Sequence, residues 1–478
     1  MNKMAENRKK VAIIGGGITG LSAAYYLQKQ CREQNLPIDI YLIEASSRLG
    51  GKIQTVRKDG FTIERGPDSF LERKKSMGIL AQELGIADQL VHNATGQSFV
   101  LVNDQLHPIP GGSIMGIPTE WKPFVTTGLF SWSGKLRAAG DLVMSRSGIE
   151  EDQPLGTFFR RRFGSEVVEN LVEPLLAGIY SGDIDKLSLH ATFPQFYEVE
   201  KKHRSLMLGM KKTRPASSTP QAANRKPQGI FQTFSGGLQS IVEALEDALT
   251  DVTILKGSKI QGVHKLSDDQ LKLVFTTGDN LIADSAIFTL LHHQLAEIFE
   301  DHGILQHYDE VPLSSVATVA MAFSKSQVVQ EKEGTGFLVS RKSDYAISAC
   351  TWVNKKWPTS APEDKVLLRS FVGKSGDESI VELPDHEIEQ IVLQDLRKVI
   401  SITGEPEFTI VTRYQKAMPQ YLVGHKERLL KAKTELAAHF PMIQLAGASF
   451  EGSGLPDCID QAIRAKDHVL DYLKPHLT

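Results

Sequence analysis

The chain has 478 residues, of which 54 are lysine or arginine and 57 are aspartate or glutamate, giving a formal net charge of -3. This length predicts roughly two to four domains, and the balanced charge excludes an overall positive field that would favour nucleic acid. No stretch reaches about 18 uninterrupted apolar residues, so no membrane span is expected. The apolar run after the basic N-terminus leads into glycines with no small-residue cleavage site, so no signal peptide is expected. Three widely spaced cysteines without metal or disulfide spacing favour a reducing, cytoplasmic location.

The first predicted unit is a strand, a glycine turn, a helix and a second strand. The strands are KVAIIG and IDIYLIEA, and the turn is GGGITG. In this pattern Gly15 permits the tight turn, Gly17 lets a diphosphate approach the backbone, and Gly20 lets the helix pack on the strand. Glu44 ends the second strand, where a carboxylate can accept hydrogen bonds from a ribose. The candidate nucleotide-binding residues here are Gly15, Gly16, Gly17, Ile18, Thr19, Gly20, Glu44 and Ala45.

A second glycine motif follows directly, ASSRLGGKIQT, over residues 45–55. The pair Gly50–Gly51 exposes backbone N–H groups beside the same diphosphate, and Arg48 or Lys52 can offset its charge. Ordinary loop cations are the alternative interpretation of Arg48 and Lys52. The motif resembles one in the flavoproteins that include monoamine oxidases, phytoene desaturases and protoporphyrinogen oxidases. Nicotinamide dehydrogenases generally lack it, so the resemblance implies FAD.

Composition and predicted secondary structure divide the chain into six segments. Residues 1–90, 229–290 and 419–478 are expected to form the FAD-binding domain, 291–418 a sheet-based substrate domain, and 91–210 a mostly helical insert that begins with a small hairpin. Residues 211–228 are rich in Pro, Ser, Ala and Gln and are expected to form a mobile loop. The predicted fold class is α/β, with a Rossmann-like domain assembled from distant segments.

The C-terminal segment LAGASFEGSGLPDCIDQAI supplies a third glycine element, which leads into a helix. Pro456 suits the first turn of that helix because its missing N–H is not needed there. The positive helix end would stabilise negative charge on a reduced flavin, and Cys458 fits packing better than covalent attachment. The candidates in this segment are Gly447, Gly454, Leu455, Pro456 and Asp457.

A narrower resemblance covers almost the whole chain. The segments IERGPDSFLERKKS, EPLLAGIYSGDIDKLSL and FEGSGLPDCIDQAI are similar to the porphyrinogen oxidases of haem biosynthesis, above all to the soluble Gram-positive bacterial branch. This resemblance implies non-covalent FAD, oxygen as acceptor, hydrogen peroxide as product, and six-electron oxidation of coproporphyrinogen III and often of protoporphyrinogen IX. It also implies flavin contacts by Gly66, Pro67, Asp68 and Ser69, an adenine contact by Ile260, and a contact by Tyr414, where the family often has Trp.

The substrate would be an apolar macrocycle that carries propionates. Arg73, Lys74 and Lys75 follow the supposed flavin-lining stretch and are candidate propionate contacts, with a solvated helix face as the alternative. No acid–base pair, catalytic side chain or metal site is predicted, since the flavin is the redox centre. The sequence leaves open copro- against protoporphyrinogen, oxidation of amines or polyenes, a redox-silent flavoprotein, peripheral membrane contact, and transfer of product to a downstream haem-pathway enzyme.

Overall fold

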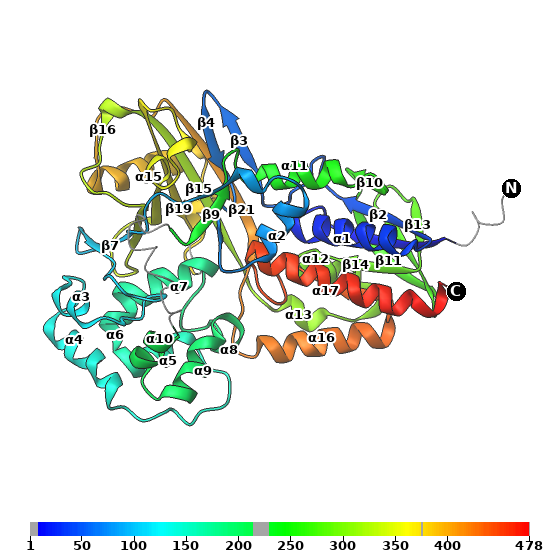
Figure 1. Cartoon of the computed structure of the whole chain (residues 1–478), viewed down its shortest axis with the longest axis horizontal. Helices are drawn as coiled ribbons and strands as arrows, with labels where there is room; N and C mark the ends of the chain where they lie inside the picture. Colours follow the sequence, from blue (N-terminus) through cyan, green and yellow to red (C-terminus); the bar gives the residue numbers. More distant parts are fainter. Residues whose placement is uncertain (1–7, 214–228, 374–375, 478) are drawn as a thin grey trace.

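The computed structural model describes residues 8–213, 229–373 and 376–477. Most of the loop expected over residues 211–228 therefore lies outside the described residues. Figure 1 shows three regions: a sheet covered by helices that carries both ends of the chain, a second sheet, and a helical unit beneath that second sheet.

A five-stranded parallel sheet organises the first region, and distant segments build it, as predicted. Its strands are, in spatial order, β10 (Val252–Lys256), β2 (Ile38–Glu44), β1 (Lys9–Ile14), β14 (Ser285–Phe288) and β22 (Ile443–Leu445). The central strand is an apolar run because helices or strands cover both of its faces: Val11 to Ile14 are all buried. The expectation of a Rossmann-like α/β fold is confirmed.

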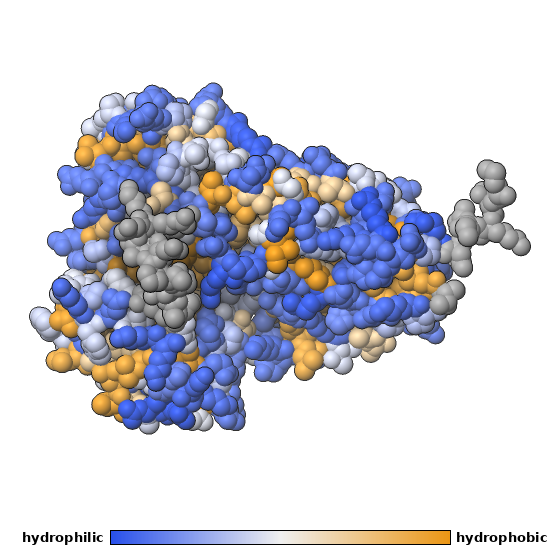
Figure 2. Space-filling view, in the orientation of Figure 1, coloured by the Kyte–Doolittle hydropathy of each residue, from blue (hydrophilic) through white to orange (hydrophobic). Residues whose placement is uncertain are grey.

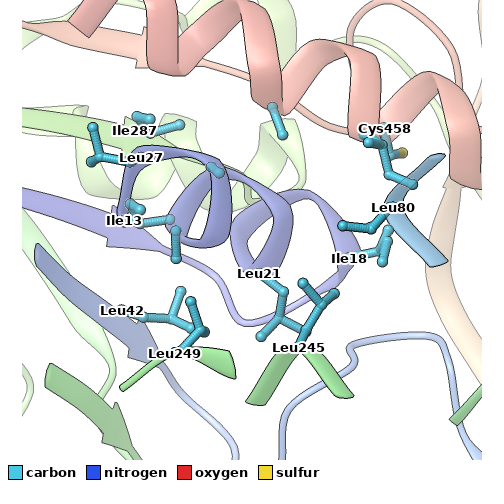
Figure 3. Packing of buried hydrophobic residues seen from close by; sticks show 14 of the residues in the cluster. Ile13, Ile18, Leu21, Leu27, Leu42, Leu80, Leu245, Leu249, Ile287 and Cys458 are labelled. Carbon is cyan, nitrogen blue, oxygen red and sulfur yellow. The ribbon is translucent and has the colours of Figure 1, made fainter. Parts of the chain in front are cut away.

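Helices from three parts of the chain cover one face of this sheet. They are α1 (Ile18–Gln34), α2 (Ser76–Glu83), α11 (Gln239–Ala248) and α17 (Leu455–Leu473). Leu21 and Leu27 of α1 pack in one cluster with Ile13, Leu245 and Cys458 (Figure 3). The first and last helices of the domain thus lie side by side, which brings the two ends of the sequence to one site.

The opposite face is covered by a small antiparallel sheet and by short helices. The elements are β11 (Ile260–Ser267), β12 (Gln270–Phe275), β13 (Asn280–Ala283), α12 (His292–Ile298), α13 (Gln306–Asp309) and α16 (His425–His439). Phe288, Phe299 and Phe440 pack between these elements and the parallel sheet.

A seven-stranded sheet forms the second region. Its order is β21 (Phe408–Pro419), β15 (Leu313–Ser324), β19 (Lys365–Val372), β18 (Ile347–Trp352), β17 (Gly336–Val339), β7 (Phe99–Val102) and β8 (Gln105–Pro108). The helix α15 (Asp385–Val399) packs on one face through Ile388, Val392 and Leu396. The hairpin of β7 and β8 precedes the helices in sequence, yet it extends this sheet through parallel pairing of β7 with β17.

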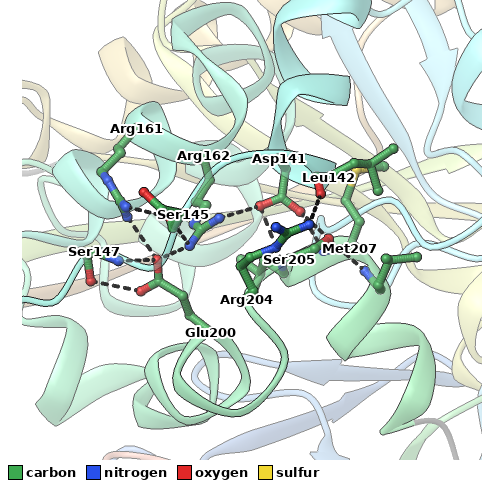
Figure 4. A network of polar contacts seen from close by, with 12 residues as sticks. Asp141, Leu142, Ser145, Ser147, Arg161, Arg162, Glu200, Arg204, Ser205 and Met207 are labelled. Carbon is green, nitrogen blue, oxygen red and sulfur yellow. Dashed lines mark hydrogen bonds and ion pairs between the residues drawn. The ribbon is translucent and has the colours of Figure 1, made fainter.

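The third region is the helical unit, which follows the hairpin as expected. It contains α3 (Trp121–Thr126), α4 (Trp132–Ala139), α5 (Leu155–Phe163), α6 (Ser165–Val167), α7 (Glu173–Tyr180), α8 (Leu189–Thr192), α9 (Pro194–His203) and α10 (Leu206–Lys212). Phe159 and Phe196 form its aromatic centre. Beside them lies a buried polar network in which Arg162 pairs with Asp141 and Glu200 (Figure 4).

The remaining elements are short. They are β3 (Thr55–Lys58), β4 (Phe61–Glu64), β5 (Phe70–Leu71), β6 (Leu90–His92), β9 (Phe231–Phe234), α14 (Val353–Lys356), β16 (Val328–Val329) and β20 (Ser401–Ile402). No helix within the described residues is both long and apolar enough to cross a membrane.

Candidate active site

A cavity of about 900 Å³ opens where β1, β2 and β14 end. In a parallel sheet flanked by helices, ligands bind at this carboxyl edge of the strands. Residues from all three regions line the cavity, from Glu44 and Ile260 on the parallel-sheet side to Tyr180 of the helical unit and Met418 of β21. The cavity is therefore one continuous space, lined by glycine loops in one part and by apolar side chains in another.

The first glycine turn leaves the start of α1 open to this cavity. The N-cap residue of α1 is Gly17, which has no side chain to cap the helix. The first N–H groups of this long helix can therefore bind an anion. A Cβ atom on Gly17 would come no closer than 4.0 Å to its nearest neighbour, the Gly51 Cα, whereas a Cβ on Gly20 would lie 1.8 Å from the Gly15 carbonyl oxygen. Gly17 thus keeps space for a ligand, and Gly20 is required by helix–turn packing.

Glu44 is held in place at the end of β2. Its Oε2 accepts the N–H of Gly16 at 2.7 Å, and its Oε1 accepts the N–H of Ser46 at 2.7 Å. Ile260, at the start of β11, lines the cavity together with Glu44 and Ala45. A fixed carboxylate beside an apolar wall suits a ribose and an adenine.

The second glycine loop docks directly on the first. The N–H of Gly50 donates to the Gly16 carbonyl at 2.8 Å, and positive φ angles at Gly50 and Gly51 allow the loop to turn. Arg48 supports this loop from behind, because its guanidinium donates to the carbonyls of Leu49 and Ile53 at 3.0 Å each. Its role in the structure is therefore to hold the loop.

Lys52 faces the cavity and donates to the carbonyl oxygen of Ala417. Burial lowers its pKa to about 8, so the ammonium form predominates at neutral pH. Unlike the side chain of Arg48, that of Lys52 can place a positive charge inside the cavity.

The stretch from Gly66 to Ser69 forms the next part of the wall. A Cβ on Gly66 would lie 1.9 Å from the Lys52 carbonyl oxygen, so the two loops touch through backbone. Asp68 accepts a hydrogen bond from Lys356 Nζ at 2.7 Å and another from the Ser69 hydroxyl at 2.8 Å. Burial alone would raise the pKa of Asp68, but Lys356 and Arg369 outweigh it and lower that pKa, so the carboxylate stays ionised.

The C-terminal glycine loop brings the start of α17 to the same cavity. Gly454 is the N-cap and Pro456 lies in the first turn, as its missing N–H allows. Gly454, Leu455 and Cys458 line the cavity. Burial raises the pKa of the Cys458 thiol to about 11, so it stays protonated and is a poor nucleophile.

A family model described as flavin containing amine oxidoreductase matches residues 18–470. The chain belongs to this family. It is 56% identical to a coproporphyrinogen III oxidase of Bacillus subtilis and 44% identical to one of Staphylococcus aureus, in alignments that cover 98% and 97% of this chain and all of each relative. It is 28% identical to a chloroplastic protoporphyrinogen oxidase 1 of spinach, over 97% of this chain and 84% of that protein.

Solved structures agree with this membership. The crystal structure of an Exiguobacterium sp. 255-15 protein assigned as a protoporphyrinogen oxidase matches with a TM-score of 0.85 at 39% identity, over 96% of this chain and 98% of that one. Reduced UDP-galactopyranose mutase, at 18% identity and a TM-score of 0.71 over 97% and 96% of the two chains, shares the fold. Family membership implies a flavin cofactor, and the glycine-lined cavity fits one.

The structure gathers most of the sequence-predicted flavin residues around this one cavity. Those that line it are Gly15, Gly17, Ile18, Thr19, Glu44, Ala45, Gly51, Lys52, Gly66, Pro67, Asp68, Ser69, Ile260, Tyr414, Gly454 and Leu455. The predicted residues that support the site without lining it are Gly16, Gly20, Arg48, Gly447, Pro456 and Asp457.

The candidate propionate cations lie outside the lining. Arg73 and Lys75 are exposed, and Lys74 forms an ion pair with Asp457 in the first turn of α17. Lys74 is nevertheless close to the wall, because its Nζ lies 4.0 Å from the position of a Cβ on Gly454.

Sequence reasoning missed a set of wall residues on the strands of the second sheet. The main ones are Val316, Thr318, Arg369, Phe371, Met418 and Pro419. The strand residues occur in apolar runs whose alternation also fits core packing. Arg369 is the exception. An arginine in the middle of the buried strand KVLLRSFV is unusual, and it could have indicated a functional site.

Proposed function

We propose that this protein oxidises coproporphyrinogen III to coproporphyrin III in haem biosynthesis, a six-electron reaction with oxygen as acceptor and hydrogen peroxide as product. The supporting observation is the single cavity, in which a nucleotide cradle adjoins an apolar chamber. The substrate assignment rests on the full-length relatives that bear this name. Protoporphyrinogen IX is the second candidate, because more distant relatives are named for it.

The cofactor we propose is FAD, held without a covalent bond. Glu44 and Ile260 would hold its adenosine end. The N–H groups from Gly17 to Thr19 and the Lys52 ammonium would hold its diphosphate, and the loop from Gly66 to Ser69 its ring system. When bound, the flavin accepts hydride from the substrate and passes electrons to oxygen. The protonated thiol of Cys458 favours non-covalent binding. The same segments, 1–90, 229–290 and 419–478, are the proposed FAD-binding domain.

The apolar walls of the chamber would position the macrocycle and exclude water. Ile179 and Tyr180 come from α7, and Phe371 and Met418 come from strands of the second sheet. Apolar side chains from two different regions suit a broad, mostly apolar substrate, because they would cover much of its surface. The helical unit and residues 291–418 would thus complete a site that the FAD-binding segments begin.

Anaerobic mixing with coproporphyrinogen III tests this function. We expect the flavin absorbance to bleach as one electron pair is transferred. Admission of oxygen should restore the flavin spectrum with formation of hydrogen peroxide, and porphyrin fluorescence should appear once three such oxidations have occurred. A parallel steady-state comparison with protoporphyrinogen IX ranks the two substrates. A flavin that stays oxidised with both porphyrinogens would contradict the proposal and would leave oxidation of an amine or a polyene to be tested.

Of the three candidates Arg73, Lys74 and Lys75, we propose that Lys74 contacts a substrate propionate, because its Nζ lies close to Gly454 in the cavity wall. Lys74→Met should raise KM for coproporphyrinogen about tenfold with kcat nearly unchanged, as expected for loss of one charge-assisted hydrogen bond of about 1.5 kcal/mol. Arg73→Met and Lys75→Met are matched controls because both side chains are exposed. A larger effect from either control, or an equal KM rise with an uncharged porphyrinogen ester, would contradict this assignment.

We further propose a cytoplasmic enzyme that makes peripheral membrane contact through α4 and the segment after it. Trp132, Leu136 and Val143 are 69, 74 and 79% exposed, and Figure 2 shows hydrophobic surface over the helical unit. Such contact would also favour transfer of the product to a downstream haem-pathway enzyme.

Sedimentation with anionic vesicles tests the membrane contact. The wild type should pellet with the vesicles, and the double variant Trp132→Ser/Leu136→Ser should stay in the supernatant, because apolar insertion drives such binding. Activity in detergent-free buffer should be equal for both proteins. Equal sedimentation of the two proteins would contradict the contact.

A further inference from the structure

A second, smaller pocket lies behind the active-site cavity and shares part of its wall. Its volume is about 30 Å³, enough for one or two water molecules, since one water needs roughly 10–15 Å³ measured in this way. Asp68 and Arg369 line both spaces. Two of its other lining residues, Ser235 and Thr359, are exposed. The small pocket is therefore lined both by residues of the active-site wall and by residues at the protein surface.

Four buried polar atoms belong to residues that line this small pocket. They are Thr233 Oγ1, Trp357 Nε1, Ser360 Oγ and Arg369 Nε, none of which has a hydrogen-bond partner among the described residues. All four residues are at least nine-tenths buried. Buried polar atoms are almost always hydrogen-bonded to protein or to ordered water. Such a cluster, in a space of this size, points to bound water.

Glu64, at the end of β4, contributes a carboxyl group to the same pocket. It accepts hydrogen bonds from the Leu238 N–H at 2.6 Å and from the Thr55 hydroxyl at 2.9 Å. Burial raises its pKa to about 7, Arg369 opposes that rise, and Asp68 adds to it. A carboxyl group in this position can take up and release a proton near neutral pH.

The other ionisable groups that line the small pocket, Asp68 and Arg369, are less suited to that exchange. Lys356 and Arg369 keep Asp68 ionised, and burial raises the pKa of Tyr180 and of Tyr414, so both phenols keep their protons. On the strand that pairs with β4, Arg57 is paired with Glu243 at the surface.

We propose that the small pocket holds an ordered water chain, and that Glu64 holds the proton that each two-electron oxidation releases until oxygen is reduced. This rests on the proposed function. In each step the substrate loses a hydride, whose electron pair goes to the flavin, and a proton. Formation of hydrogen peroxide consumes the electron pair, the hydride's hydrogen and one proton. The sum is proton-neutral, but the two half-reactions are separate, so one proton must be stored or released between them. Arg369 and Asp68 act here as positioning residues.

The first test is infrared spectroscopy of the resting holoenzyme without substrate, titrated from about pH 5 to about pH 9, a range that spans the raised pKa of Glu64. A protonated-carboxyl band that titrates near pH 7 should be present in the wild type and in Glu243→Gln, and absent from Glu64→Gln. Glutamine keeps an acceptor for the Leu238 N–H, so the fold should persist. If the same band titrates in Glu64→Gln, the proposal is overturned.

The second test is anaerobic mixing with coproporphyrinogen in weakly buffered solution above pH 7, with a pH-indicator dye. During flavin reduction we expect almost no proton in solution from the wild type, and about one proton per electron pair from Glu64→Gln, because a glutamine cannot store it. Glu64→Asp should restore storage in part. Trp357→Phe, which removes the indole N–H and leaves a smaller aromatic ring, should slow proton uptake.

These outcomes separate the two proposals. Equal proton release by the wild type and by Glu64→Gln would overturn proton storage even if both proteins oxidise the substrate. No flavin reduction in the wild type would instead overturn the proposed function, and with it the storage role. If Glu64→Gln does not fold, the Trp357→Phe variant tests the water chain. Proton uptake by Glu64 at the wild-type rate in that variant would contradict the water chain.

Discussion

Gly17→Ala is expected to abolish tight flavin binding while leaving the apoprotein folded. The backbone of Gly17 has φ -73° and ψ 179°, which alanine adopts freely, and its new methyl group would meet no protein atom closer than 4.0 Å. That methyl group would instead occupy the cavity at the start of α1, where a diphosphate must approach the N–H groups. We expect a loss of affinity of about tenfold to hundredfold, or roughly 1.4–2.7 kcal/mol.

Gly20→Ala, three positions along the same turn, should instead destabilise the folded apoprotein. Its methyl group would lie 1.8 Å from the Gly15 carbonyl oxygen, so α1 must move away from the end of β1. Overpacking of this kind costs about 1–3 kcal/mol in the free energy of unfolding. Flavin would then be lost because the whole turn shifts.

Chemical denaturation of the two apoproteins, followed by flavin titration, distinguishes these effects. Gly17→Ala should unfold at the wild-type midpoint and bind flavin weakly, whereas Gly20→Ala should unfold at a lower denaturant concentration. Normal flavin affinity in Gly17→Ala would mean that the cofactor does not approach this turn, and the whole placement proposed for FAD would have to be revised.

The cofactor end of this site was predictable from sequence because its residues are local. Gly15, Gly17 and Glu44 follow from a turn between a strand and a helix, where spacing alone fixes the geometry. Arg48 shows the limit of such reasoning: the motif placed a cation near the diphosphate, but the side chain turns back to hold the carbonyls of its own loop. Direction of a side chain depends on neighbours that local spacing does not define.

The substrate end was harder to predict, because distant segments meet there. Phe371 and Met418 lie on strands β19 and β21, and Ile179 lies on a helix of the inserted unit. In sequence each is an apolar residue in an apolar run, indistinguishable from core. Likewise, nothing local indicates that Glu64 and Arg369, about 300 positions apart, line one pocket; only long-range packing decides that.

Arg162→Met is expected to destabilise the protein by about 3–5 kcal/mol, the cost of leaving the buried carboxylate of Asp141 without its arginine partner. Arg162 and Asp141 have fully buried side chains, and that of Glu200 is 2% exposed. Figure 4 shows that Arg162 lies between these two carboxylates. Methionine would preserve the apolar stem but remove both ion pairs. Burial opposes ionisation of Glu200, and its arginine partners overcome this and lower its pKa.

Arg160 and Arg162, two positions apart on α5, provide a matched comparison because they differ mainly in burial. Arg160 pairs with Asp185 at the surface, with side-chain exposures of 30 and 47%, so Arg160→Met should cost no more than about 1 kcal/mol. The lowered pKa of Glu200 means that its contribution to stability is present above the unfolded-state pKa and is lost as the pH falls through the folded-state pKa. Arg162→Met should therefore lose less stability on acidification than the wild type does. Urea denaturation at neutral and acidic pH measures both effects. If the two variants cost the same at neutral pH, burial does not control the strength of this network, and the helical unit must owe its stability to its aromatic core instead.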